Sequence, residues 1–203
     1  MNNVIKKVEL TMKEYMKDND GSHDFEHVER VRKISQLIAT SIEYKDDDNM
    51  LDLLALLHDY EDHKYKKIDN ISFKDLEEFL LHECELELTK VEKIIQYIPL
   101  ISYSKNMKHI TSSNDILPQV DIIVQIVSDA DKIDALGAIG IARCFAYTGY
   151  TKQSLQKGID HFEEKLFKLQ YCMYTELGKQ MAKSSTDIMK EFVNNYYKSS
   201  LSL

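Results

Sequence analysis

The sequence has few of the residues that interrupt regular structure. Only two prolines and six glycines occur in 203 residues. Their scarcity, together with abundant Lys, Glu, Leu, Ile and Met, favours a mostly helical chain. A length of 203 residues suits one ordinary domain that can bury its own core. We therefore expect an all-α protein with a single domain over residues 1–203.

Cysteines are also few, and their spacing excludes two common frameworks. Cys84, Cys144 and Cys172 are odd in number and widely separated. Three such residues form neither a zinc-ribbon pattern nor a set of disulfides, and they fit a reducing compartment. We interpret all three as small core residues.

Two further absences limit the partners of the protein. The sequence has no run of 18 apolar residues and no signal-peptide pattern, which predicts a soluble, cytoplasmic protein with no membrane association. The net charge of −8 and the sequence pI of about 5.4 argue against an electrostatic grip on nucleic acid. A charged substrate would need local cations, either Lys and Arg or a metal.

The most unusual stretch that is present is LLALLHDYED, from Leu53 to Asp62. Five apolar residues run directly into His58, Asp59, Glu61 and Asp62. A helix that is apolar on all sides belongs in a core, where an imidazole and carboxylates are costly to bury unless something compensates them. A divalent cation is the simplest compensation. The alternative is a helix end with solvated acids.

A second stretch, SDADKIDALGAIGIAR, repeats this conflict. Asp129, Asp131 and Asp134 interrupt an apolar run, and two buried acid clusters in one small domain suggest a shared ion. His27 precedes Val31 by four residues, which places it beside the apolar stripe of its helix. The alternative for His27 is a buried histidine bonded to a backbone carbonyl.

Loops and C-terminal helices complete the predicted organisation. We expect Pro99 to end a helix, residues 102–117 to form a binding loop that includes Lys105 and His109, and Pro118 to start a buried helix. Apolar stripes predict packing helices within 152–198, which would cover the core or form a homodimer face. The first of these stripes suggests one helix continuing through Met173 and Leu177.

In order, His27, His58-Asp59 and Asp131 resemble the H…HD…D signature of the HD-domain superfamily of metal-dependent phosphohydrolases. The segments SHDFEHVERV, LLHDYEDHKY, ISYSK, DADKIDALGAIGIAR and HFEEKLFKL resemble the bacterial and fungal HD hydrolase branch that includes nucleotide pyrophosphohydrolases. The resemblance covers roughly residues 20 to 195, with the signature motifs within 20–145. This chain reads AKSSTD where that branch carries an acidic-basic pair. If that pair contacts the substrate, we expect the specificity of this chain to differ.

The resemblance implies an HD-domain helical bundle and a set of site residues. The ligands of one divalent cation would be His27, His58, Asp59 and Asp131, and the ion would be Mn²⁺ or a similar one (Mg²⁺, Ni²⁺, Co²⁺ or Fe²⁺). Asp62 would position or deprotonate the attacking water. Phosphate would be held by Arg30, Lys64 and Lys132. Asp129 and His23 are expected in supporting positions around the ligands.

The resemblance also implies a small phosphate substrate, and we expect it to be a nucleotide. Lys64, Lys66 and Lys67, with Arg30 and Lys132, offer more positive charge than one phosphate needs. We therefore expect hydrolysis of a (deoxy)nucleoside triphosphate to monophosphate and pyrophosphate. One alternative is a nucleoside monophosphate phosphatase or another small phosphate-ester hydrolase. Another is a non-catalytic HD domain that binds a nucleotide.

Overall fold

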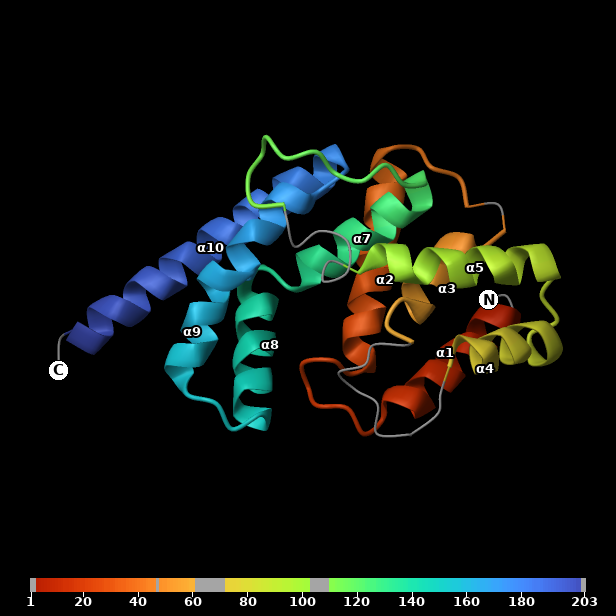
Figure 1. The fold of residues 1–203 in the computed structure, drawn as a ribbon, viewed down its shortest axis with the longest axis horizontal. Helices are drawn as coiled ribbons and strands as arrows, with labels where there is room; N and C mark the ends of the chain where they lie inside the picture. The colour runs from red at the N-terminus through yellow and green to blue at the C-terminus, as the bar shows by residue number, and fades with distance from the viewer. Residues whose placement is uncertain (1–2, 47, 61–71, 103–109, 202–203) are drawn as a thin grey trace.

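The computed structural model describes residues 3–46, 48–60, 72–102 and 110–201 (Figure 1). All regular secondary structure in these ranges is helical, which confirms the all-α prediction. The elements, in order, are α1 (Asn3–Met16), α2 (Phe25–Ser41), α3 (Met50–Leu57), α4 (Phe73–Glu78), a π-helical turn η2 (Phe79–Glu83), α5 (Leu88–Ile101), α7 (Ile122–Asp134), α8 (Gly137–Tyr150), α9 (Leu155–Glu164), a 3₁₀ segment η3 (Leu166–Cys172) and α10 (Glu176–Leu201).

The centre of the molecule is built from α2, α3 and α7. Helix α3 is short and almost wholly apolar, and every one of its residues except Asp52 is buried. Each leucine buried in this way contributes about 1.5–3 kcal/mol relative to an exposed one. The helix packs against α1, α2, α5 and α7. Its C-terminal end, where His58 and Asp59 follow, is therefore held firmly inside the fold.

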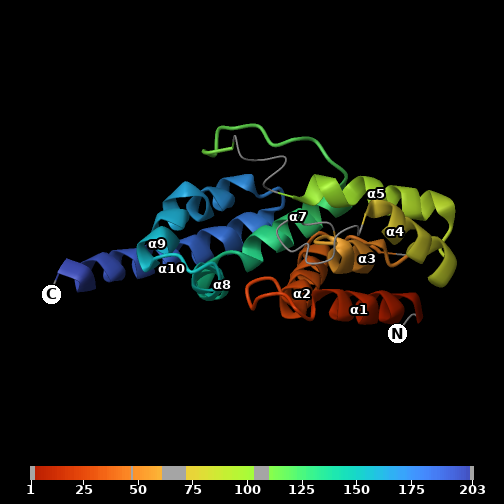
Figure 2. The same cartoon turned by 60° about the horizontal axis from the view of Figure 1, so that its bottom comes forward.

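The C-terminal elements form the other end of the molecule. Figures 1 and 2 show α8, α9 and α10 grouped there, with α7 leading to them from the α1–α5 end. Helix α10 packs on α7, α8 and η3 and then extends past them. Its Ile188 and Tyr197 side chains are exposed. The expected homodimer face on this helix stays a prediction.

A buried acid of α7 fixes the start of α10. Asp129 accepts hydrogen bonds from the backbone N–H of Tyr174 (2.9 and 3.1 Å) and of Thr175 (2.8 Å), and from Thr175 Oγ1 (2.8 Å). Lys132 Nζ lies 3.7 Å from the same carboxylate. Asp129 is fully buried, so these donors replace the water that it loses. Its role is to join two helices.

Three predicted helix boundaries are wrong. Pro99 lies inside α5, which continues to Ile101. Helix α7 begins at Ile122 rather than at Pro118, because the Asp121 carboxylate accepts a hydrogen bond from Ile123 N (3.1 Å) and caps the helix there. The helix expected to run on through Met173 and Leu177 is divided into α9, η3 and the start of α10.

None of the helices in the described part of the chain combines the length and the apolar character needed to cross a membrane.

Candidate metal centre

Side chains from three helices or the residues directly after them meet at a single point. His27 lies in the first turn of α2, His58 and Asp59 follow α3, and Asp131 lies in α7. His27 Nε2 is 3.2 Å from His58 Nε2, 3.3 Å from Asp59 Oδ2 and 3.6 Å from Asp131 Oδ1. His58 Nε2 is 3.6 Å from Asp59 Oδ2 and 3.8 Å from Asp131 Oδ1. Residues far apart in sequence thus present four donor atoms to one small volume.

A hydrogen bond on the side of the ring that faces away from the cluster sets the orientation of His27. Its Nδ1–H donates to Asp134 Oδ2 at 2.7 Å. A carboxylate only accepts hydrogen bonds, so the proton lies on Nδ1 and the lone pair of Nε2 points toward the cluster. Helix α2 places the residue there, since the Asp24 side chain caps it by accepting from His27 N (3.2 Å).

His58 is oriented in the same way by a different partner. Its Nδ1 donates to the backbone carbonyl of Ala55 at 2.8 Å, within the last turn of α3. A carbonyl oxygen is an acceptor, so the Nε2 lone pair of His58 again faces inward. The Nε2 lone pairs of both imidazoles therefore point to the same place. Metal-binding histidines have this arrangement, in which the other ring nitrogen makes a hydrogen bond.

Asp134 is itself held by two arginines. Arg30 donates to it through Nε (2.6 Å) and NH2 (3.1 Å), and Arg143 donates through NH1 (2.7 Å). Burial alone would raise the pKa of the Asp134 carboxyl, but the hydrogen bonds from His27 and Arg30 outweigh it and hold the pKa well below its usual range. Asp134 thus stays ionised beneath His27.

The charges of the side chains in this cluster favour the binding of a cation. Burial opposes ionisation of Asp59, yet the neighbouring His58 and His27 hold the pKa of its carboxyl well below the ordinary value. Burial and Arg143 lower the pKa of His27, but hydrogen bonds to Asp134 and Asp59 prevail and the net shift is upward. The carboxylates therefore favour a cation, whether proton or metal, next to His27 Nε2.

The donor set fits a divalent ion. Two neutral imidazoles and two carboxylates suit Mn²⁺ and similar ions. Atoms that lie about 2.1 Å from one ion are about 3 to 4 Å from one another, which is the spacing observed here. The ligand atoms of His27, His58 and Asp131 all lie within 4.8 Å of one another, with Asp59 adjoining both histidines. The histidines are buried, and Asp59 and Asp131 keep 16% and 26% of their side-chain surface exposed, so the centre opens on the carboxylate side.

Two residues predicted to hold phosphate have other partners. Arg30 makes the two-pronged contact with Asp134 described above. Lys132 is almost fully buried and its Nζ donates to Ser128 Oγ (2.6 Å) beside Asp129. A phosphate contact would require Lys132 to leave both neighbours. We therefore assign Arg30 to holding Asp134 and Lys132 to the core.

The remaining predicted site residues divide into two groups. The first group lies outside the described residues and consists of Asp62, Lys64, Lys66, Lys67, Lys105 and His109. Asp129, expected as a support for His27 or Lys132, lies beside Lys132 but serves chiefly α10. His23 is hydrogen-bonded to Ser22 Oγ (2.6 Å), and its ring centroid is 6.3 Å from that of His27. Burial, followed by the nearby Arg143, lowers the pKa of His23 to about 3, so it is neutral at pH 7.

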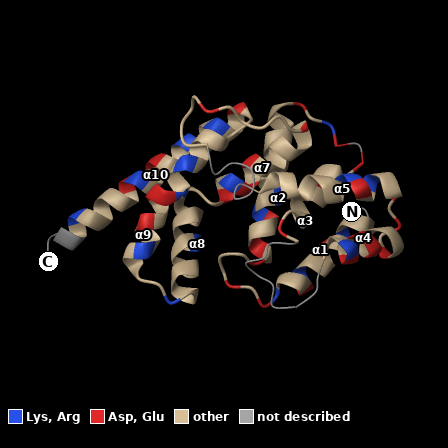
Figure 3. Cartoon of the chain, in the orientation of Figure 1, with Lys and Arg blue, Asp and Glu red and all other residues tan. Residues whose placement is uncertain are grey.

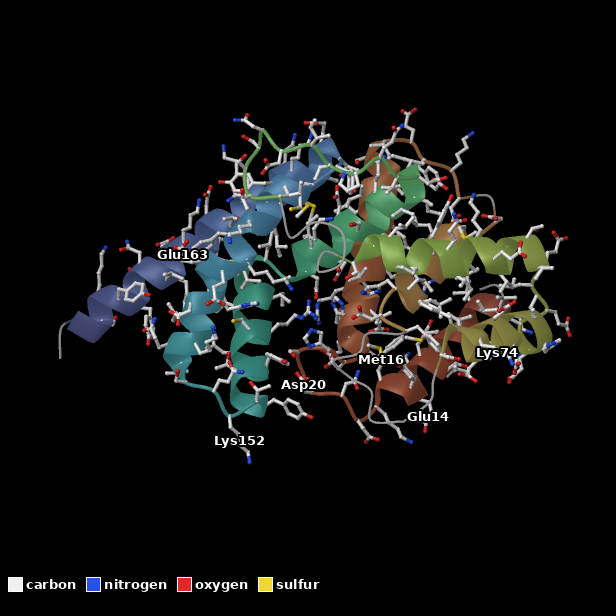
Figure 4. The ribbon with its side chains drawn as sticks, in the orientation of Figure 1. Glu14, Met16, Asp20, Lys74, Lys152 and Glu163 are labelled. Carbon is white, nitrogen blue, oxygen red and sulfur yellow. The ribbon has the colours of Figure 1, made fainter. Side chains whose placement is uncertain are left out.

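The sequence placed Asp134 in an acid cluster but did not indicate its contact with His27, and it indicated no role for Arg143. Asp134 stands three residues after Asp131, a spacing that puts both on one face of a helix, and this signal could have linked it to the ligands. Arg143 had no such signal. It joins Asp134 to the loop before α2 by donating to Ser22 O (2.6 Å), and Figure 4 shows Asp20 of that loop beside α8.

Comparisons with known proteins show relatives in sequence and in fold. No protein-family model matches the chain. The uncharacterized protein YpgQ of Bacillus subtilis is 28% identical over 185 residues, which are 89% of this chain and 86% of the relative. The crystal structure of YpgQ in complex with ADP has a TM-score of 0.77 at 22% identity, covering 96% of this chain and 97% of the other.

A solved structure with higher identity is named for its superfamily. It is an HD-superfamily hydrolase from Bacillus thuringiensis, with a TM-score of 0.71, 27% identity, and coverage of 98% of this chain and 97% of the other. The chain thus shares the all-helical fold of an HD-superfamily hydrolase, and the motif residues that carry its resemblance to that superfamily meet in space.

Proposed function

We propose that the protein hydrolyses a (deoxy)nucleoside triphosphate to the monophosphate and pyrophosphate, using one divalent ion held by His27, His58, Asp59 and Asp131. The observation that carries the metal assignment is the convergence of two imidazole lone pairs and two carboxylates within 3.2–3.8 Å. These four atoms, which can all donate electron pairs to a metal, are hydrogen-bond acceptors with no hydrogen-bond donor among them. They repel one another unless a cation compensates them.

The proposed reaction is an in-line displacement at the α-phosphorus. The oxygen of a water molecule bonds to that phosphorus, and the bond to the oxygen bridging the α- and β-phosphates breaks. The bridging oxygen leaves with its electron pair on pyrophosphate, and the protons of the water pass to the products or to solvent. A divalent ion at the centre supplies Lewis-acid polarisation of a phosphoryl oxygen and activation of water.

The protein's own groups fix the geometry for this step. Asp134 and the Ala55 carbonyl keep the two histidine rings in the tautomer that binds a metal. Arg30 and Arg143 keep Asp134 ionised and in place. Asp62, which lies outside the described residues, remains our candidate for positioning or deprotonating the water, because its place after the HD pair matches related HD hydrolases.

One observation supports a nucleotide as the substrate. The structural neighbour YpgQ has been solved with ADP, and its fold is shared over nearly the whole of both chains. The chain itself is acidic overall, so a polyanionic substrate depends on a metal and on local cations. Mn²⁺ as the ion and a cytoplasmic location stay part of the proposal.

Phosphorus NMR of the products tests the bond that is cleaved. The purified chain, loaded with Mn²⁺ and then in parallel with Mg²⁺, Ni²⁺, Co²⁺ or Fe²⁺, is incubated with a panel of nucleoside tri-, di- and monophosphates. Pyrophosphate and monophosphate should appear together from triphosphates. Orthophosphate as the first product, or activity confined to monophosphates, would identify a phosphatase instead. Nucleotide binding without turnover under any of these ions would identify a non-catalytic domain.

A single substitution separates hydrolysis from metal binding. Asp62→Asn keeps the size of the side chain but removes the proton acceptor. We expect normal metal content and a turnover lower by roughly 100-fold, the scale of losing a general base. Turnover close to that of the wild type would exclude the assigned role of Asp62 without affecting the metal assignment.

A further inference from the structure

A second cavity adjoins the metal centre on the side of the C-terminal helices. The α8–α9 pocket has a volume of about 360 Å³, and its lining includes His23, Arg143, Tyr147, Lys157, His161 and Lys165. His23 lines this pocket, and its ring centroid lies 6.3 Å from that of the proposed ligand His27. Arg143 also connects the two, because it lines the pocket and donates to Asp134.

The charge of this pocket contrasts with that of the whole protein. The chain has 34 acidic and 26 basic residues. Among the described residues that line the pocket, three are Lys or Arg and none is Asp or Glu. Figure 3 shows α8 almost entirely in the colour of uncharged residues, so the positive charge here comes chiefly from α9 and the residue after it. Such a concentration of one charge favours an anionic ligand.

Lys157 can reach such a ligand at low cost. Lys157 pairs with Glu164 at 3.0 Å, but both side chains are about half exposed (51% and 56%). An exposed ion pair contributes little free energy, so Lys157 can exchange it for a phosphate. Lys165 lies between α9 and η3, at the point where the backbone leaves the α-helix.

We infer that the α8–α9 pocket binds the β- and γ-phosphates of the substrate, with Lys157 and Lys165 as phosphate-binding residues. This inference rests on the proposed function. With the α-phosphate at the metal centre, the other two phosphates can extend past His23 into the pocket. The cations there stabilise the negative charge that the pyrophosphate acquires as the α–β bond breaks. This subsite replaces the phosphate contacts expected of Arg30 and Lys132, whose partners lie elsewhere.

Binding of inorganic pyrophosphate tests the pocket directly. Calorimetric titration is carried out on the full metal-loaded chain and on Lys157→Gln, Lys165→Gln and Lys168→Gln, with orthophosphate as the reference ligand. Lys168 is the matched control, because it carries the same charge three residues after Lys165 but does not line the pocket. Circular dichroism and thermal unfolding of each variant establish that it is folded.

The wild type should bind pyrophosphate more tightly than orthophosphate. Lys157→Gln and Lys165→Gln should each raise the pyrophosphate Kd by about tenfold, the scale of one lost charge-assisted hydrogen bond, while Lys168→Gln leaves it unchanged. Equal affinity in all four proteins, or no binding by the wild type, overturns the subsite even if NMR shows hydrolysis to pyrophosphate. If orthophosphate is instead the first product but the two substitutions still weaken pyrophosphate binding, the pocket stands and the proposed bond cleavage fails.

Discussion

His27 and Asp134 are 107 positions apart in the sequence and 2.7 Å apart in the structure, measured from Nδ1 to Oδ2. This contact joins the first turn of α2 to the last turn of α7. It determines which nitrogen of His27 carries the proton, and so which nitrogen is free to bind a metal. The affinity of the centre therefore depends on a residue that does not itself face the ion.

Asp134→Asn should weaken metal binding by about 10- to 100-fold, the range found when the partner of a metal-binding histidine is lost. The amide keeps the size of the side chain but loses the charge that fixes the His27 proton and pairs with Arg30 and Arg143. Calorimetric titration of the metal-free variant with Mn²⁺ measures the change.

Asp52→Asn provides the control for this experiment. Asp52 also accepts a two-pronged contact from an arginine, Arg32, at 3.0 and 2.7 Å, but it lies in the first turn of α3 and outside the donor cluster. Its substitution should leave the affinity for Mn²⁺ unchanged. A similar loss of affinity in both variants would mean that Asp134 acts only through general stability.

His58→Ala and Asp59→Ala should each abolish stoichiometric metal binding. Both changes take a donor from a cluster whose remaining acids then face one another with less compensation, so the melting temperature should fall as well. Elemental analysis of the purified variants measures the metal content. One ion per chain in either variant would refute the ligand assignment.

Removal of the metal gives an independent check on the same residues. Because a ligand that binds only the folded state stabilises it, a chelator should lower the melting temperature of the wild type. The chelator should have no effect on His58→Ala, which has no ion to lose. An equal response of the two proteins would show that the chelator acts elsewhere.

Helix geometry explains how far the acids of α7 could be interpreted from the sequence. The motif predicted that His27, His58, Asp59 and Asp131 come together, and the structure brings their donor atoms to distances of 3.2–3.8 Å. Asp129 is two residues before Asp131, about 200° around the helix, so it faces α10 instead. Which neighbour each acid meets depends on packing between distant segments, and the sequence does not contain that information.

The same limit applies to the cations. Arg30 and Lys132 stand next to ligand motifs, and adjacency suggested phosphate as their partner. The structure instead gives Arg30 a carboxylate from α7 and buries Lys132 between Ser128 and Asp129. The lysines of the α8–α9 pocket lie in segments that the sequence predicts to be packing helices. Lys165 belongs to the segment HFEEKLFKL, which resembles the HD hydrolase branch, but the sequence does not indicate that it lines a pocket together with His23.

The Arg32–Asp52 contact should make stability depend on pH in a defined direction. Burial would raise the pKa of the Asp52 carboxyl, but hydrogen bonds from Arg32 and Gln36 lower it below its ordinary value. A carboxyl with a lowered pKa in the folded state stabilises the protein above its unfolded pKa, about 3.9, and loses this contribution as pH falls through the folded value.

Asp52→Asn should therefore cost about 1 kcal/mol at pH 7 and progressively less below pH 4. Urea unfolding of the wild type and of Asp52→Asn over this pH range measures the difference in their free energies of unfolding. The contribution of the metal centre is the same in both proteins and cancels in this difference. A constant difference at every pH would contradict the assignment.

Gly178→Ala should destabilise the protein, because α10 begins too close to α7 to admit a side chain there. A Cβ at this position would lie 2.4 Å from Asp129 Oδ2 and 2.7 Å from Thr175 Oγ1, the two groups that fix the start of α10. Displacing them should cost about 1–3 kcal/mol, the usual scale of overpacking.

Gly149→Ala is the matched control, since nothing lies within 4 Å of its Cβ and alanine favours helix α8 by up to about 1 kcal/mol. Denaturant unfolding should thus shift in opposite directions for the two variants. Equal stability of Gly178→Ala and the wild type would show that Asp129 does not constrain α10.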